Sequence, residues 1–330
     1  MGRNFTRRAA MATAAGGLML AATASGALAQ GKPVLRFSVV FSEQDIRAEM
    51  TRKMAAALAD DFTIQPYFGG TLFGQGTELV AIQRGNLEMS NVGPQDIANQ
   101  IPAWTILTSA YLFRDPAHVN AFWNSDAGAE MKKLAEDQLG VHIIGPTYYG
   151  TRHLGLKPDR KITTPADMAG IQLRMPPGES WQFLGEAMGA SPTAMAYAEV
   201  YTGLQTGAID GQDNPLPNVR NMKFYEVMSQ IVLTSHLVAF DVMTISLGAW
   251  NAMTPQQQVR FQAAADEAIA WSAAEHQKQE GELAEFFRAQ GLQVYVPDVE
   301  AFRAYAQDKY LKSPLSARWP AGMLERINNL

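Results

Sequence analysis

Cysteine is absent from all 330 residues of this chain. Its absence excludes a disulfide framework, a thiolate metal site and a lipid anchor on cysteine. The five histidines lack the H-x-x-x-H spacing of a helical metal site. Neither a G-x-S-x-G elbow nor a P-loop occurs, and Gly74-Gln75-Gly76 lacks the third glycine of a dinucleotide fingerprint. We therefore expect no metal and no cofactor, and these absences weigh against an enzyme.

Charge is modest, with 18% charged residues, 47% hydrophobic residues and a net charge of −5. This is the balance of an ordinary globular protein. No run of basic residues is present, so we expect no nucleic-acid partner. If the ligand is an anion, a local positive site must capture it against the overall field.

Residues 1–29 have the pattern of an export signal. Three arginines precede an apolar region rich in Ala, Gly, Leu and Met (9–27), and Ala27-Leu28-Ala29 is typical of a cleavage site. The apolar region is too rich in small residues to indicate a permanent membrane span. Thr6-Arg7-Arg8 partly matches a twin-arginine signal, with ordinary secretion as the alternative.

Removal of this segment leaves 24 basic residues (27 − 3) against 32 acidic ones, a net charge of −8. A cysteine-free chain with an export signal fits an oxidising compartment, most simply a bacterial periplasm. We therefore expect a mature periplasmic protein without a membrane anchor.

The first third of the chain alternates between strand and helix patterns. Residues 33–41, 62–68 and 87–92 have strand character, and 46–60 and 78–84 have helical spacing. This β-α-β-α-β order is typical of a doubly wound parallel sheet. Further expected elements are strands at 141–149, 152–156, 171–175 and 233–247, and helices at 181–188 and 197–205.

The chain is long enough for two domains. Thr254-Pro255 predicts the start of a helix that runs to about residue 290 and is about 50 Å long, more than one small domain needs. Such a helix is expected to cross between two domains. We predict a first lobe of 30–150 plus about 240–275, and a second of 151–239 plus about 276–330.

Arg174 ends an apolar, strand-like run that Pro176-Pro177 closes. An isolated arginine is most often a solvated surface charge. A guanidinium at the end of an apolar strand, however, is costly to desolvate unless an anion meets it, and its planar fork fits a carboxylate or phosphate. Arg152 is a second candidate cation. Asn214 lies in Asp213-Asn214-Pro215, which predicts a turn.

With these residues in place, the mature chain resembles the extracytoplasmic solute-binding subunit of tripartite ATP-independent periplasmic (TRAP) transporters. The resemblance rests on Gly170-Ile171-Gln172-Leu173-Arg174, on 189–193 and on the block 199–215. The turn at 69–74 and Leu112-Phe113-Arg114-Asp115 also match. The resemblance implies a two-lobed α/β fold like that of periplasmic binding proteins, each lobe a sheet flanked by helices, with a long helix spanning both lobes.

The same resemblance implies roles for three residues. Arg174 would clamp the carboxylate of an organic acid, Asn214 would donate its amide to the same ligand, and Arg152 would be an auxiliary cation. The protein would be a monomer that delivers its ligand to the small and large membrane subunits for ion-gradient-driven uptake. A periplasmic enzyme exported in folded form and a ligand-binding partner of a membrane sensor remain as alternatives.

The other end of the ligand is less defined by the sequence. Glu43 and Asp45 would repel a second acidic group, although Ser42 or Asp45 could instead cap the following helix. We expect His236 to be a structural histidine. Candidate pocket residues are Phe41, Phe73, Gln95, Tyr148, Tyr149, Trp181 and Phe240. Aromatic residues at strand ends are more often core. If several reach the cleft, they favour a monocarboxylate with an apolar or aromatic tail over a small dicarboxylate, and a sugar acid also stays open.

Overall fold

A computed structural model of the chain describes residues 31–330, so the predicted export signal, 1–29, lies outside the described residues. The strands are β1 (Val34–Ser38), β2 (Thr63–Tyr67), β3 (Met89–Val92), β4 (Val141–Leu156), β5 (Gln172–Met175), β6 (Ser191–Ala194), β7 (Gly211–Pro215), β8 (Gln230–Ser246) and β9 (Gln293–Tyr295). The α-helices are α1 (Ile46–Ala57), α2 (Glu78–Gln83), α3 (Pro94–Ala98), α4 (Pro116–Trp123), α5 (Asp126–Leu139), α6 (Glu179–Ala187), α7 (Val200–Thr206), α8 (Leu216–Asn221), α9 (Leu247–Asn251), α10 (Pro255–Ala289), α11 (Val299–Lys312) and α12 (Met323–Asn328). Short 3-10 helices are η1 (Pro102–Thr108), η2 (Pro165–Met168), η3 (Tyr197–Glu199), η4 (Phe224–Val227) and η5 (Ser316–Arg318).

The strands among residues 31–330 form one nine-stranded sheet in the order β2-β1-β3-β8-β4-β7-β5-β6, with β9 paired to β8. The predicted parallel arrangement is right for β1 with β2 and β3, and β5 also pairs in parallel with β6 and β7. It is wrong for the middle of the sheet, where β8 runs antiparallel to β3 and β4, and β4 antiparallel to β7. The α/β class with helices flanking the sheet is confirmed.

Two long strands connect the two halves of the sheet. β4 has 16 residues and β8 has 17, and they pair along their length. The C-terminal part of β8 pairs with β3 on one side and with the N-terminal part of β4 on the other. At the opposite end, the C-terminal part of β4 pairs with β7 and the N-terminal part of β8 pairs with β9. The two strands predicted at 141–149 and 152–156 are therefore one strand. Its pairing with β8 shifts register between Tyr148 and Gly150 and again between Arg152 and Leu154, which bends the strand near its middle.

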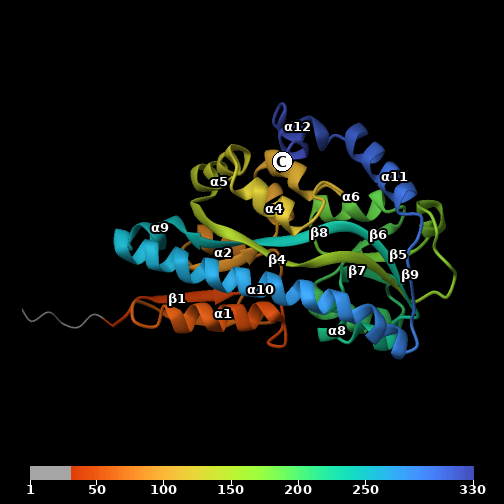
Figure 1. Cartoon of the computed structure of the whole chain (residues 1–330), viewed down its shortest axis with the longest axis horizontal. Coiled ribbons are helices and arrows are strands. Elements are labelled where there is room, and N and C mark those ends of the chain that lie inside the picture. Colours follow the sequence, from red (N-terminus) through yellow and green to blue (C-terminus); the bar gives the residue numbers. More distant parts are fainter. Residues whose placement is uncertain (1–30) are drawn as a thin grey trace, which may run out of the picture. The chain divides into compact units, whose positions relative to one another are not determined.

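Helices cover both faces of this sheet (Figure 1). On one face, α1 and α10 pack with Phe37 and Phe261 in a buried apolar cluster, and Leu283 and Phe287 of α10 join a second cluster with α7 and α8. On the other face, α4 and α5 enclose one cluster, and α6 and α11 enclose another. Apolar side chains therefore fill the space above and below each half of the sheet.

The long helix predicted from Thr254-Pro255 is confirmed as α10, which has 35 residues and a rise of about 52 Å. Thr254 accepts a hydrogen bond from the Gln257 backbone, and the Gln257 side chain accepts one from the Thr254 backbone, which completes a capping box. Its two ends pack in the two different clusters of one face, so α10 contacts both halves of the sheet. None of the helices within 31–330 combines the length and apolar character needed to cross a membrane.

The lobe limits proposed from the sequence stay a prediction. Because β4 and β8 run through both halves of the sheet, residues Lys32–Leu330 form one contiguous unit. Near the end of the chain, Met323 and Ile327 of α12 pack in the same cluster as Met131 of α5. The last helix therefore lies over the half of the sheet that contains β3.

Two glycines in helices should respond oppositely to alanine. Gly281 lies in α10 with open space where a Cβ would be placed, so Gly281→Ala should stabilise the protein by about 0.5–1 kcal/mol. In Gly128→Ala, the added Cβ would lie 2.3 Å from the Phe122 carbonyl oxygen and 2.7 Å from the Trp123 Cα. We expect this crowding between α4 and α5 to destabilise the protein by about 1–3 kcal/mol. Urea unfolding followed by circular dichroism measures both, and equal effects of the two substitutions would contradict the packing described here.

Candidate functional site

A cavity lies beside the middle of β4, where the two halves of the sheet meet. Its lining residues are Val40, Arg47, Gln75, Tyr149, Arg152, Arg174, Pro176, Trp181, Tyr197, Asn214, Asn218 and Asp241. Of the residues predicted from the sequence, it brings together Arg174, Arg152, Asn214, Tyr149 and Trp181. Arg47 and Asp241 belong to the elements around β3, and Arg174 and Asn214 to those around β7, so both halves contribute to the lining.

Arg174, near the end of β5, is the most unusual charge of the cavity because it is 1% exposed. Its Nε donates to the Met195 carbonyl at 2.8 Å, and its Nη2 donates to Gln75 Oε1 at 3.2 Å. No Asp or Glu among residues 31–330 lies within ion-pair distance of it, and its Nη1 has no acceptor there. Burial lowers the pKa of the Arg174 guanidinium to about 10. Arg174 is therefore a buried cation whose direct partners are neutral.

Arg152 is bound differently, by a carboxylate of the protein itself. Its Nε and Nη2 donate to the two carboxylate oxygens of Asp213 at 2.7 and 2.9 Å, and its guanidinium lies 4.8 Å from the Trp181 ring. Burial disfavours the charged form of Asp213, but Arg152 holds the pKa of that carboxyl well below its usual range. A predicted auxiliary cation is thus already paired, although it still lines the cavity.

Two residues close to Asp213, His236 and Asn214, are held in place by hydrogen bonds of their side chains. His236 is fully buried, with its Nε2 3.1 Å from Asp213 and its Nδ1 2.8 Å from Thr234 Oγ1, which confirms the expected structural histidine. Asn214 donates from Nδ2 to Gln212 Oε1 at 2.6 Å. The turn predicted at 213–215 is wrong, because this segment pairs with β4 as strand β7. Cross-strand hydrogen bonds outweigh the local turn preference here.

Arg47 was missed by the sequence reasoning. It lies in the first turn of α1 and is 3% exposed, with hydrogen bonds to both oxygens of Asp45 and, at 2.9 Å, to Asp241. The Phe41 and Tyr149 rings lie 4.4 and 4.3 Å from the guanidinium carbon, a double cation–π contact. Asp45 also accepts from the Arg47 backbone as the N-cap of α1, which confirms the capping alternative. Asp45, in the acidic loop before α1, is the sequence feature that could have indicated a buried cation nearby.

The remaining predicted pocket residues lie outside the lining of this cavity. Glu43 is exposed in the loop before α1. Phe41 is buried beneath Arg47 and contacts Phe68. Gln95 is buried in α3, and Phe73 packs against the cluster of α4 and α5. Phe240 belongs to that same cluster.

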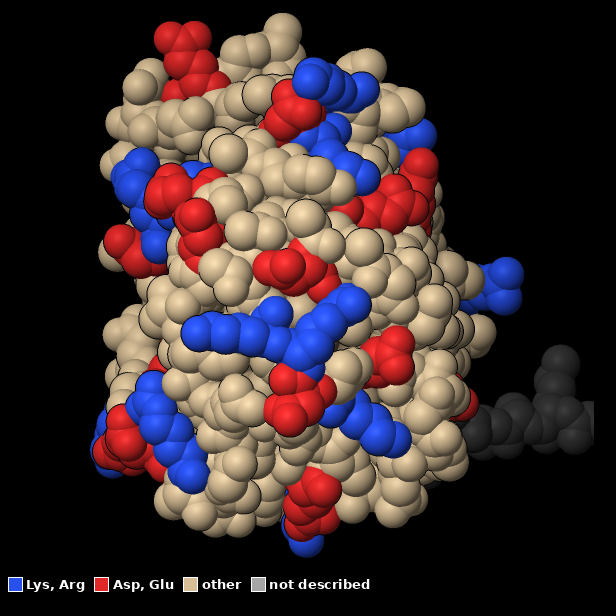
Figure 2. Space-filling view, turned by 90° about the vertical axis from the view of Figure 1, so that its right-hand side faces the viewer, with Lys and Arg blue, Asp and Glu red and all other residues tan. Residues whose placement is uncertain are grey.

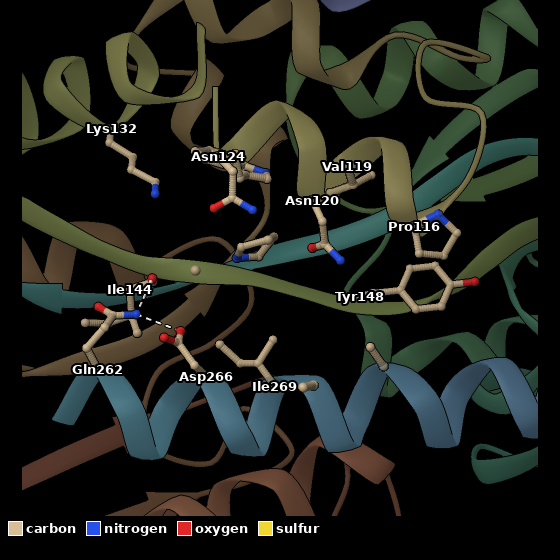
Figure 3. A pocket seen from close by; sticks show the side chains of 15 residues that line it. Pro116, Val119, Asn120, Asn124, Lys132, Ile144, Tyr148, Gln262, Asp266 and Ile269 are labelled. Atoms are coloured by element: carbon tan, nitrogen blue, oxygen red, sulfur yellow. Dashed lines mark hydrogen bonds between the residues drawn. The ribbon is translucent and has the colours of Figure 1, made fainter. Parts of the chain in front are cut away.

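A larger hollow lies between α4, α5, β4 and α10 (Figure 3), and Tyr148 lines it. Its charged residues are one cation, Lys132 on α5, and one carboxylate, Asp266 on α10. Gln262 donates to the Ile144 carbonyl and to Asp266 at 3.1 and 2.8 Å along one side. Because Asp266 in the same hollow offsets the charge of Lys132, the cavity of Arg174 is the stronger candidate for binding an anion.

The surface gives no alternative site for an anion on the face shown in Figure 2, where basic and acidic side chains are interspersed. Across the whole chain the net charge is negative. Among residues 31–330, no three His, Asp or Glu side chains converge in a way that could hold a metal ion.

Comparison with known proteins gives a consistent result. Residues 37–314 match the family described as bacterial extracellular solute-binding protein, family 7. A TRAP periplasmic solute-binding protein from Roseobacter denitrificans with bound 3-deoxy-D-manno-oct-2-ulosonic acid is 42% identical, with a TM-score of 0.89 over 90% of this chain and 99% of that chain. A second one from that organism, with bound β-D-glucuronate, is 25% identical, with a TM-score of 0.81 over 89% of this chain and 98% of that chain.

A curated relative is the sialic acid-binding periplasmic protein of Vibrio cholerae. It is 32% identical over 210 residues, which cover 64% of this chain. The match spans 65% of that relative's own length, just under two thirds. The similarity to the two solved structures, in contrast, covers nearly their whole length.

The buried ion pair of Arg152 and Asp213 should contribute strongly to the free energy of unfolding. Asp213→Asn leaves the guanidinium buried without a countercharge, and we expect a loss of about 3–5 kcal/mol in the free energy of unfolding. The matched control is Asp61→Asn, which removes a carboxylate that pairs with the exposed Arg260 and should have a far smaller effect. Urea unfolding of the two variants measures the difference. Similar losses would show that the Arg152 pair has no special structural weight.

Proposed function

Because this chain belongs to family 7 of the bacterial extracellular solute-binding proteins, the solute-binding subunits of TRAP transporters, we propose that it captures a sugar acid in the cavity of Arg174. It is accordingly a binding protein and not an enzyme. In this proposal the Arg174 guanidinium holds the carboxylate of the ligand, and the surrounding side chains read the rest of it.

One observation carries this proposal: Arg174 is fully desolvated and has only neutral partners among residues 31–330. Desolvating a guanidinium is costly, and removal of a charged partner from a buried pair costs several kcal/mol, so a ligand carboxylate would recover much of this energy. An arginine–carboxylate contact is also directional, since two parallel hydrogen bonds fix its geometry. Arg152 and Arg47 are already paired with Asp213, Asp45 and Asp241.

The relatives support a hydroxylated acid as the ligand. The 42% identical protein from Roseobacter denitrificans contains 3-deoxy-D-manno-oct-2-ulosonic acid, and the Vibrio cholerae protein is described as binding sialic acid. Both compounds are 2-keto-3-deoxy sugar acids. The aromatic residues that would favour an apolar tail are divided: Tyr149 and Trp181 line the cavity, whereas Phe41, Phe73 and Phe240 do not. We therefore propose a sugar acid of this class over a ligand with an apolar tail.

Membership of this family supports delivery of the ligand to a membrane permease as the next step. We propose that the mature protein acts in the periplasm after export, by the twin-arginine or the general route, and presents its ligand to the small and large membrane subunits. The two halves of the sheet both line the cavity, so ligand binding would favour a closed arrangement of the halves over an open one. The closed form would be the one that the membrane subunits recognise.

The role of Arg174 can be tested with Arg174→Lys, which keeps the charge but loses the planar fork. We expect at least a tenfold loss of affinity for 3-deoxy-D-manno-oct-2-ulosonate, because one of two charge-assisted hydrogen bonds is lost. Isothermal titration calorimetry measures the affinity, and mass spectrometry of compounds retained through purification identifies the natural ligand. Wild-type affinity in Arg174→Lys would overturn the carboxylate assignment.

Lys132→Arg provides the matched control, because Lys132 is the cation of the larger hollow in Figure 3. This exchange between the two basic residues should leave the affinity unchanged. If Lys132→Arg weakened binding and Arg174→Lys did not, the ligand would bind in the larger hollow.

A further inference from the structure

Two acceptor atoms in the cavity of Arg174 have no donor among residues 31–330. Asp241 accepts from Arg47 Nη1 through Oδ2 at 2.9 Å, which leaves its Oδ1 without a donor. Asn218 donates from Nδ2 to the Tyr197 hydroxyl at 3.0 Å, and its Oδ1 is buried without a partner. Asn218 is 3% exposed and the Asp241 side chain 14% exposed. A buried polar atom left without a partner costs about 1–3 kcal/mol, so Asn218 Oδ1 needs a donor, and the second oxygen of the partly exposed Asp241 carboxylate is free to accept one.

The two acceptors and the unpaired cation come from separate elements. Arg174 lies on β5, Asn218 on α8 and Asp241 on β8, and all three line one cavity. Existing hydrogen bonds orient the two free oxygens. Arg47 holds the other oxygen of Asp241, and the hydrogen bond to the Tyr197 hydroxyl holds the amide group of Asn218. A ligand in this cavity is therefore offered one guanidinium and two oriented acceptors.

The charges of the cavity limit how much negative charge a ligand can bring. Three buried arginines, Arg47, Arg152 and Arg174, are balanced by three aspartates, Asp45, Asp213 and Asp241. One ligand carboxylate at Arg174 would meet the guanidinium that lacks a direct ion pair. A second carboxylate near Asp241 would place like charges together at low dielectric constant, which is strongly unfavourable. Hydroxyl groups donate to a carboxylate without adding charge.

Resting on the proposed function, we propose that Asp241 and Asn218 are specificity-determining residues that accept hydrogen bonds from hydroxyl groups of the acid held by Arg174. The ligand class is then a monocarboxylate with hydroxyl groups on at least two carbons beyond the carboxylate. Asp241 additionally rejects dicarboxylates, because it is the carboxylate that their second acidic group would meet.

The test compares three probes on wild type and Asp241→Asn by isothermal titration calorimetry: 3-deoxy-D-manno-oct-2-ulosonate, D-glucuronate and succinate. Wild type should prefer the tighter-binding hydroxylated acid over succinate by at least a hundredfold. Asp241→Asn keeps a carbonyl acceptor but loses the negative charge, so this preference should fall by at least tenfold. A wild type that binds succinate as tightly as the hydroxylated acids, or a preference unchanged in Asp241→Asn, would overturn the inference.

Asn218→Ala gives an independent measurement should Asp241→Asn fail to fold. It should weaken the hydroxylated acids by about tenfold, one hydrogen bond, and leave succinate unchanged. Equal weakening of all three probes would instead show a merely structural role for Asn218. Asp266→Asn, in the larger hollow, is the matched control for the loss of an aspartate charge and should leave all affinities unchanged.

Arg174→Lys, titrated in parallel, separates this inference from the proposed function. If it weakens every acid while the preference in Asp241→Asn stays at the wild-type value, carboxylate capture stands and the specificity inference falls. If it binds every acid as wild type does, the proposed function falls, and the inference that rests on it falls as well.

Discussion

The burial of three guanidinium groups around one cavity is the constraint on which the rest of the site depends. Each group must be compensated, because an unpaired buried charge costs far more than a surface ion pair contributes. Arg47 is compensated by two aspartates and two aromatic faces, and Arg152 by Asp213 and the face of Trp181. Arg174 has no carboxylate partner and relies on a backbone carbonyl, an amide oxygen and the Tyr197 ring, 5.9 Å from its guanidinium carbon. The two paired arginines help to build the wall of the cavity, and the third is the one that we propose for the ligand.

The sheet explains how these groups reach the same place. The strands β4 and β8 run antiparallel to each other through both halves of the sheet. They therefore connect the elements of one half with those of the other. Their register shifts near Tyr148 and Arg152 bend the pair where the cavity lies. Gly150, with φ of 123°, fits at this bend because a Cβ there would lie 2.5 Å from the Pro215 Cβ. The irregular centre of β4 thus brings Tyr149 and Arg152 to the cavity.

Much of the fold, and part of the site, could be predicted from the sequence, and the failures have physical reasons. Helical and strand periodicity located most elements, but strand direction depends on pairing that periodicity does not encode. Arg174 could be predicted from the sequence because its local context is unusual. The pairing of Arg47 with Asp241 could not be predicted, since the two residues are 194 positions apart. The predicted pocket residue Phe240 is one position away from Asp241, which lines the cavity. Successive residues of a strand face opposite sides, so the phenylalanine enters the core and the aspartate faces the cavity.

In the proposed function, Gln75 would link ligand capture to the approach of the two halves. It lies in the loop before α2, and its Oε1 accepts from Arg174 Nη2 and, at 2.7 Å, from the Tyr197 backbone. Both donors belong to elements of the other half, so these contacts join the two halves. The guanidinium that we assign to the ligand is therefore also a contact between the halves. A carboxylate that fixes this guanidinium would hold it ready for Gln75, and Gln75 in turn would hold it in place for the carboxylate. Capture and closure would then stabilise each other through one side chain, without a separate relay.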